Sequence, residues 1–168
     1  MNKKIYTITL LVVLMFLISS MRNLFIEDIK NVAMSNNNIE KFNKHILREG
    51  KYSFSLPAGW EIDSVNDSNN DIIVTFNDKD DLYGDISIIN TDIDNVYGDK
   101  KSDIDSDIII EEGYEWTIIT EIDEKIINNY YIRDYSEGKV LIIKFSYTEG
   151  KQKNSIKVVL DYIAMSFI

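Results

Sequence analysis

Three aspartates at alternate positions have the spacing in this chain that most resembles a metal site. Asp103, Asp105 and Asp107 show the alternation that begins a calcium-binding EF-hand loop. That loop also requires a glycine at its sixth position and a glutamate at its twelfth, where this chain has Ile108 and Tyr114. The EF-hand motif therefore fails. An irregular, weak calcium site at the three aspartates remains as a hypothesis, with a solvated acidic loop as its alternative.

Carboxylates between residues 103 and 124 could also serve in hydrolysis, which needs two acids fixed across a cleft with different pKa values. Glu111 with Glu112, and Glu121 with Asp123 and Glu124, supply acids, but their spacing singles out no pair. The single histidine, His45, has no motif partner that would make it a base or a ligand. The sequence has neither a Gly-x-Ser-x-Gly elbow nor a glycine-rich phosphate loop. We therefore predict no catalytic residues, and an extracytoplasmic hydrolase using these acids is the alternative.

The composition excludes further classes of chemistry. The chain has no cysteine, so it forms no disulfide, thiolate nucleophile or Cys-ligated zinc site, and one histidine excludes a His-only zinc site. No cofactor is predicted. The net charge is −10, and residues 61–124 hold 20 acidic side chains against 3 lysines. Such a field repels phosphate backbones, so we expect no nucleic-acid partner; a divalent cation or a basic protein surface fits better, with solubility as the plainer explanation.

The amino-terminal segment is apolar. After Lys3 and Lys4, residues 5–21 run for 17 positions without a charge, which as a helix is about 26 Å against a hydrocarbon core of ~30 Å. Residues 18–20 form a poor signal-peptidase site because a large residue precedes the two serines. We therefore predict one membrane-spanning anchor over residues 1–21 in a single-pass cell-membrane protein with its domain outside the cytoplasm. A cleaved signal with a secreted domain, or a buried helix, are the alternatives.

Residues 22–50 are predicted to be a helical linker. Apolar residues recur at spacings of three and four over residues 21–33, which is typical of an amphipathic helix that continues the anchor. A second short helix is expected over residues 39–47, where Ile39, Phe42 and Ile46 share one face and Gly50 closes it.

The hydrophobic period changes to two from Lys51, and residues 51–168 are predicted to be one α+β domain. Alternating segments at 52–56, 72–76, 86–88 and 114–122, and a hairpin of 126–135 with 139–147, predict an antiparallel sheet of about six strands. A helix following Asn154 carries a wide apolar stripe. This helix and the N-terminal helical segment should pack on the sheet. One core should contain Phe54, Trp60, Trp116, Phe145 and Phe167.

Residues 52–60 and the closing helix carry a resemblance to a known family. The strand Tyr-Ser-Phe-Ser-Leu that leads into Pro57, Ala58, Gly59 and Trp60, and the chain end near Phe167, resemble the PsbP-like family of extrinsic photosystem II subunits and DcrB-type bacterial envelope proteins. The resemblance covers about residues 51–168. It implies a structural motif of Phe54, Pro57, Trp60 and Phe167, a binding fold without catalytic machinery, and partners that differ between members.

This chain departs from the family in two respects, because it lacks the lipidation cysteine of the envelope members and a glycine near Asn128 and Asn129. No ligand-binding residue can be transferred to it. The sequence therefore predicts a non-catalytic, membrane-anchored binding or accessory module at the cell envelope, with a protein partner of unknown identity.

Overall fold

The computed structural model describes residues 3–66, 72–101, 107–112 and 115–168. The chain forms three α-helices, one short 3₁₀ turn and nine strands within these ranges. Their order is α1 Lys3–Asn36, β1 Phe42–Leu47, η1 Arg48–Gly50, β2 Tyr52–Pro57, β3 Glu61–Val65, β4 Ile72–Asn77, β5 Tyr83–Ile89, α2 Ile93–Lys101, β6 Asp107–Glu112, β7 Thr117–Asp123, β8 Ile126–Ser136, β9 Lys139–Thr148 and α3 Ile156–Met165.

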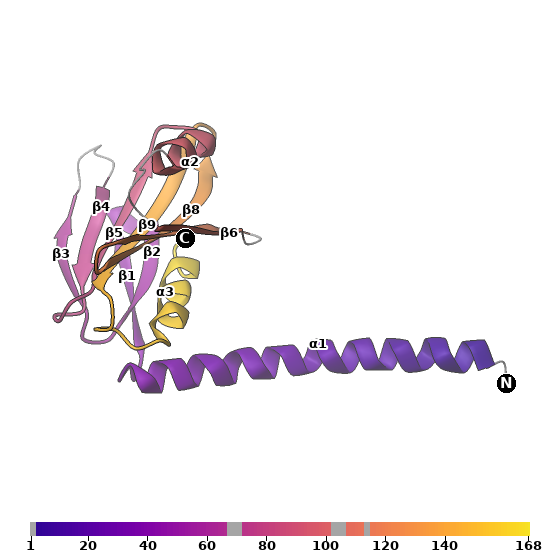
Figure 1. Cartoon of the computed structure of the whole chain (residues 1–168). Helices are drawn as coiled ribbons and strands as arrows, with labels where there is room; N and C mark the ends of the chain where they lie inside the picture. The colour runs from indigo at the N-terminus through magenta and orange to yellow at the C-terminus, as the bar shows by residue number, and fades with distance from the viewer. Residues whose placement is uncertain (1–2, 67–71, 102–106, 113–114) are drawn as a thin grey trace.

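Seven strands form one antiparallel sheet in the order β3-β4-β5-β9-β8-β7-β6, and β1 pairs with β2 in a separate hairpin. The hairpin and α3 cover one face of the sheet, and α2 lies against part of the other (Figure 1). The carboxy-terminal residue joins the hairpin, since Ser53 and Ile168 exchange two backbone hydrogen bonds of 2.9 Å. The fold is therefore mixed α+β, and its sheet has one strand more than the six or so predicted.

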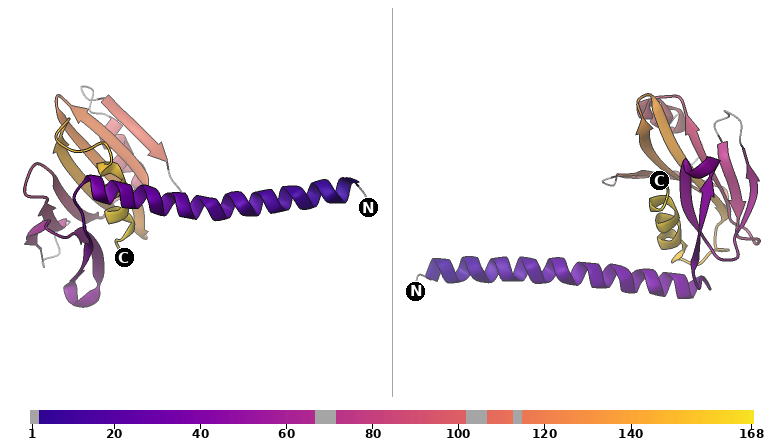
Figure 2. Two further views of the ribbon diagram at one scale, coloured as in Figure 1. Left: turned by 90° about the horizontal axis from the view of Figure 1, so that it is seen from below. Right: turned by 180° about the vertical axis from the view of Figure 1, so that it is seen from behind.

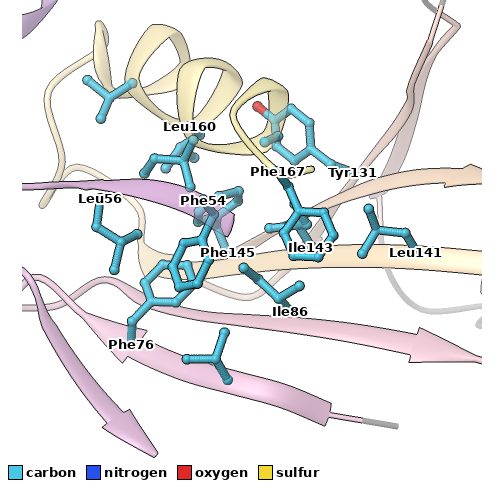
Figure 3. Close-up of a cluster of buried hydrophobic side chains, with 14 of the residues drawn as sticks. Phe54, Leu56, Phe76, Ile86, Tyr131, Leu141, Ile143, Phe145, Leu160 and Phe167 are labelled. Carbon is cyan, nitrogen blue, oxygen red and sulfur yellow. The ribbon is translucent and has the colours of Figure 1, made fainter. Parts of the chain in front are cut away.

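The main core lies between the sheet, the hairpin and α3 (Figure 3). Its centre is aromatic: the Phe76 ring lies 6.0 Å from that of Phe145, and the Phe145 ring lies 5.5 Å from that of Tyr131, both edge to face. The Tyr131 hydroxyl donates to Asp161 on α3 at 2.7 Å, which fixes the helix to the sheet. Phe54 and Phe167 are also buried here. Of the side chains that the period of two placed inward on β9, Leu141, Ile143 and Phe145 are buried, and Tyr147 is only partly buried against the core.

The opposite face of the sheet is only partly covered. Under α2, a smaller cluster buries one apolar side chain of the helix against four from β7, β8 and β9: Val96, Ile119, Tyr130, Ile132 and Val140. Beyond α2, the same face presents polar residues of β5 and β9, among them Asp85, Lys144 and Ser146. One face of the sheet is thus a closed core, and part of the other is open.

Helix α1 runs away from the domain, and only its carboxy-terminal end contacts it (Figures 1 and 2). Ala33 is buried there, Met34 packs against the main core, and the Lys30 ammonium lies 3.7 Å from the centre of the Tyr162 ring on α3. Further from the domain, the apolar side chains described between Tyr6 and Met21 are 50–74% exposed.

The prediction of a membrane-spanning helix over residues 1–21 is wrong. In the described ranges, no helix is both long enough and apolar enough to cross a membrane. Helix α1 has 34 residues, but its second half carries Glu27, Asp28 and Lys30 and is not apolar. The uncharged run alone is about 26 Å long, which is short of the ~30 Å hydrocarbon core. The predicted signal anchor, membrane contact and single-pass location are corrected with it.

The helix predicted over residues 39–47 is also wrong. Residues from Phe42 to Leu47 form strand β1, because pairing with β2 and burial of Leu47 outweigh a helical period only nine residues long. Asn38, with φ of 55°, ends α1 in the left-handed region. The closing helix begins one residue later than predicted, with Ser155 rather than Asn154 at its N-cap.

Candidate functional site

A cleft of about 600 Å³ lies between the end of α1 and three loops at one end of the sheet. The loops are the β2–β3 turn, the β4–β5 loop and the β9–α3 loop, which meet near the point where α1 reaches the domain (Figure 1). The side chains or backbone that line it come from Asn36, Asn37, Asn38, Ile39, Ala58, Gly59, Trp60, Asp78, Asp80, Asp81, Lys151, Gln152 and Lys153. Its volume falls within the roughly 300–1,000 Å³ usual for ligand sites.

Two aspartates build the wall formed by the β4–β5 loop. Asp78 Oδ1 accepts the backbone N–H groups of Asp80, Asp81 and Leu82 at 2.9–3.0 Å, and its Oδ2 accepts from Gln152 Nε2 at 3.0 Å. Asp81 accepts the backbone N–H of Thr148 at 2.6 Å and its hydroxyl at 2.8 Å. Both carboxylates therefore serve to fix this loop against the end of β9 and the segment that follows it.

The end of α1 forms the opposite wall and is itself fixed. Asn37 Nδ2 donates to the carbonyl of Ala33 at 2.8 Å and to the hydroxyl of Ser155 at 3.0 Å. The backbone N–H of Ile39 donates to Met34 O at 2.9 Å. Because both walls are held by hydrogen bonds to other elements, the cleft exists before any ligand binds, which lowers the entropic cost of binding.

Trp60 supplies the aromatic surface of the cleft. Its ring stacks on buried Phe76, with centres 6.1 Å apart and planes 26° apart, and the residue remains partly exposed. The turn that places it has Gly59 at φ of 104°, where a side chain would be strained, and the backbone N–H of Trp60 donates to Pro57 O at 3.1 Å. Trp60 therefore lies at the edge of the core that was predicted to enclose it, whereas Phe54, Trp116, Phe145 and Phe167 are buried.

Three charged side chains that line the cleft form no ion pair with the described residues. The carboxylate of Asp80 and the ammonium groups of Lys151 and Lys153 form no ion pair within the described part of the chain, and all three residues are exposed. An indole surface with amides and unpaired charges of both signs suits a polar chain that carries both hydrogen-bonding groups and charges, such as a peptide segment.

The predicted metal and hydrolase residues lie elsewhere. Asp103 and Asp105 lie outside the described residues, and Asp107 begins β6, opposite Ile122. Glu111 and Glu112 end β6 and are paired in register with β7. Glu121 is buried on β7, where its carboxylate accepts from the Tyr130 hydroxyl at 2.9 Å. Among the residues that the structure describes, no three His, Asp or Glu side chains are grouped to hold a metal ion.

His45 lies on β1 and packs against the core. Its ring stacks on that of Phe54, with centres 5.5 Å apart, and burial lowers the pKa of the imidazole. A lowered pKa keeps the ring neutral at pH 7. In the described part of the chain it accepts no hydroxyl hydrogen bond from a serine or threonine, so it shows the geometry of a packing residue.

The sequence did not identify the cleft, and only a weak signal could have done so. The run Asn77-Asp78-Lys79-Asp80 is typical of an Asx turn, and Lys79 adopts the left-handed φ of 74° that such turns tolerate. That signal predicts a turn but not its neighbours. The contacts of Asp78 with Gln152 and of Asp81 with Thr148 join segments about 70 residues apart.

No protein-family model and no curated protein sequence matches the chain. Its structure is similar to that of the Ran-binding protein Mog1p of Saccharomyces cerevisiae, with a TM-score of 0.56 and 8% identity over 76% of this chain and 95% of Mog1p. A point mutant of Mog1 gives a TM-score of 0.53 with the same identity and coverage. The fold is that of Mog1p. Cyanobacterial PsbP from Synechocystis sp. PCC 6803 is also similar, with a TM-score of 0.49 and 16% identity over 77% of this chain and 93% of PsbP.

At such identities the likeness concerns the fold alone. The likeness to Mog1p supports the overall architecture, and the chain is assigned to no family, the PsbP-like family of the sequence resemblance included.

Proposed function

We propose that this chain is a non-catalytic binding module that holds an extended segment of a protein partner in the cleft beside Trp60. The observation that carries the proposal is the cleft itself: about 600 Å³, fixed on both walls, with an aromatic surface and unpaired charges around it. Aromatic residues are the side chains that most often anchor protein interfaces, and prearranged walls reduce the cost of ordering.

The side chains of the cleft favour binding over chemistry. Asp78 and Asp81, the two carboxylates best fixed in space, each accept several hydrogen bonds from the protein, so neither is available as a base. Of the acids named for the alternative hydrolase, Glu121 is engaged by Tyr130 and lies on β7, away from the cleft. A protein-binding role also agrees with the use of the same fold by Mog1p, which binds Ran.

The absence of cysteine allows a direct test by site-specific photocrosslinking, since one introduced cysteine is the only thiol. Asp80→Cys carries the crosslinker at the cleft. Glu137→Cys, in the exposed β8–β9 turn at the opposite end of the strands, is the matched control. Both are irradiated in extracts of the cells that produce the protein. We expect one discrete adduct from position 80, no such adduct from position 137, and loss of the adduct when Trp60→Ala is added.

Equal adducts from both positions would contradict the proposal, as would an adduct that Trp60→Ala leaves unchanged. Circular dichroism of each variant separates a lost contact from a lost fold.

A further inference from the structure

A second, smaller hollow lies on the sheet face that α3 leaves open. It has a volume of about 220 Å³, and its polar lining comes from Asp63, Thr75, Tyr83, Asp85, Lys144 and Ser146 on β3, β4, β5 and β9. These residues gather because β5 pairs with β4 on one side and β9 on the other, which aligns Thr75, Asp85 and Lys144 in one row across the strands. The hollow is smaller than the usual ligand pocket of roughly 300–1,000 Å³, so it suits a single side chain.

Asp85 is the unusual residue of this hollow. It is half-buried, and within the described ranges its carboxylate accepts no hydrogen bond and forms no ion pair. A carboxylate removed from water without a partner lowers stability unless a ligand supplies the missing donors. The neighbouring acid, Asp63, does have a donor, the side-chain amide of Asn77.

Lys144 stands directly opposite Asp85 in register, but the described residues include no direct ion pair between the two. Opposite charges at paired positions normally attract across strands. Here the ammonium group lies over the ring of Tyr130 on the far side, 5.5 Å from its centre, and forms no ion pair in the part of the chain that the structure describes. The ammonium group thus lies over an aromatic face and attracts Asp85 without pairing with it, so the aspartate carboxylate keeps its hydrogen-bonding capacity for the hollow.

We propose that this hollow binds the guanidinium group of an arginine side chain from a partner protein. A guanidinium is planar, donates two parallel hydrogen bonds to one carboxylate and stacks on aromatic rings. Asp85 offers the carboxylate, and Tyr83, 60% exposed, offers the ring. Asp63 adds a second negative charge, and residues 61–124 as a whole are strongly acidic. An anionic ligand would instead meet two carboxylates and one lysine that is already engaged.

The proposal goes beyond the cleft beside Trp60, because it concerns a different surface and is tested with a different probe. N-acetyl-arginine amide is titrated into the ¹⁵N-labelled full-length chain, and amide chemical shifts are followed by NMR. We expect saturable shifts at Gly84, Asp85 and Ser146 and none at Gly59 or Trp60. N-acetyl-citrulline amide, which has the same shape without the charge, should cause none.

Three variants sharpen the titration. Asp85→Asn keeps the size of the side chain and should weaken binding at least tenfold, whereas Asp123→Asn, an exposed acid at the end of β7, should leave the affinity unchanged. Lys144→Met removes a repelling charge and should strengthen binding several-fold. The proposal is overturned if citrulline shifts the same amides, if Asp85→Asn binds as the wild type does, or if Lys144→Met weakens binding. Preserved peak dispersion shows that each variant is folded.

Discussion

The two faces of the seven-stranded sheet differ in what their side chains do. Along β9, Ile143 and Phe145 point into the closed core and are fully buried, whereas Lys144 and Ser146 point to the open face. The closed face meets α3 and the β1–β2 hairpin, and α2 covers only part of the open face (Figure 1). The same backbone therefore holds the fold together on one side and presents charges on the other. We expect the polar residues on the uncovered part of this face to tolerate substitution without loss of the fold, which leaves them available for recognition.

The largest difference between the faces should appear in neighbouring residues of β9. Phe145→Ala removes a fully buried ring that contacts Phe76 and Tyr131, so it should lower the free energy of unfolding by about 3–5 kcal/mol. Lys144→Ala should change it by less than about 1 kcal/mol, because the removed contacts are partly exposed. Urea unfolding monitored by tryptophan fluorescence measures both. Equal losses would show that the open face also supports the fold.

A glycine on β5 provides a second test of how tightly the closed face is packed. A Cβ at Gly84 would lie 2.2 Å from Cε2 of Phe76, a ring that is fully buried and cannot move aside. Gly84→Ala should therefore destabilise the chain by about 1–3 kcal/mol, measured by the same unfolding curves. Gly98→Ala is the control, since α2 leaves open space there and alanine favours a helix. A neutral Gly84→Ala would mean that Phe76 can repack.

On the open face, we expect a substitution of Asp85 to stabilise the chain, whereas the substitutions on the closed face destabilise it, and we expect this gain in stability to depend on pH. Burial raises the pKa of Asp85 above its ordinary value of 3.8, with Lys144 opposing the shift. The folded chain then holds this proton more tightly than the unfolded chain, so the stability contributed by Asp85 falls as the pH rises from 3.8 to the raised pKa and stays low above it. Asp85→Asn should therefore raise the melting temperature at pH 7.

The advantage of Asp85→Asn should shrink as the pH falls and vanish where the aspartate is protonated in both states. Calorimetric scans of both proteins at several pH values test this. The charged and titratable groups that line the hollow with Asp85 are Asp63, Tyr83 and Lys144. Because Asp63 is the other acid, scans of Asp63→Asn separate its contribution to the pH dependence from that of Asp85. An asparagine variant less stable at pH 7 would indicate that Asp85 has a stabilising partner.

The smallest effect is expected at the exposed edge of the sheet. Lys79 and Glu61 form an ion pair of 2.6 Å, with both side chains more than half exposed. Such pairs contribute little because water and salt screen them, so Glu61→Gln should change the free energy of unfolding by no more than about 0.5 kcal/mol. Urea unfolding curves of the wild type and Glu61→Gln are measured at low salt and at 0.5 M salt, and the small difference between the two proteins should disappear at 0.5 M salt. A loss above 1 kcal/mol that persists in salt would contradict this.

Much of the closed face could be predicted from the sequence because it follows local periods. The period of two in β9 and the stripe of α3 identify residues that the structure buries: Leu141, Ile143, Phe145, Ile156, Val159, Leu160, Ile163 and Ala164. The errors arose where local pattern was short or biased. Within the helix predicted over residues 39–47, residues 42–47 pair as a strand because β2 offers them a partner, and α2 and β6 occupy the acidic stretch in which no pattern was predicted.

The two candidate sites could not be predicted because they are made by contacts between distant segments. Asp85 and Lys144 lie opposite one another only when β5 pairs with β9, and no local spacing reports that pairing. Likewise, Trp60 was predicted as a core residue from its size, but its partial exposure depends on where α1 and the β4–β5 loop end. Density of acids in the sequence drew attention to residues 103–124 instead, where no local spacing singled out a site.

The most direct test of the division between the two faces is a thermal melt of the full-length chain and of Asp85→Asn, each with and without N-acetyl-arginine amide. A ligand that binds only the folded state raises the melting temperature. We predict that the wild type is stabilised by the ligand, while Asp85→Asn melts at an equal or higher temperature alone and shows no further rise. A variant that melts lower without ligand, or that keeps the full ligand-induced rise, would contradict the claim that this face is reserved for binding.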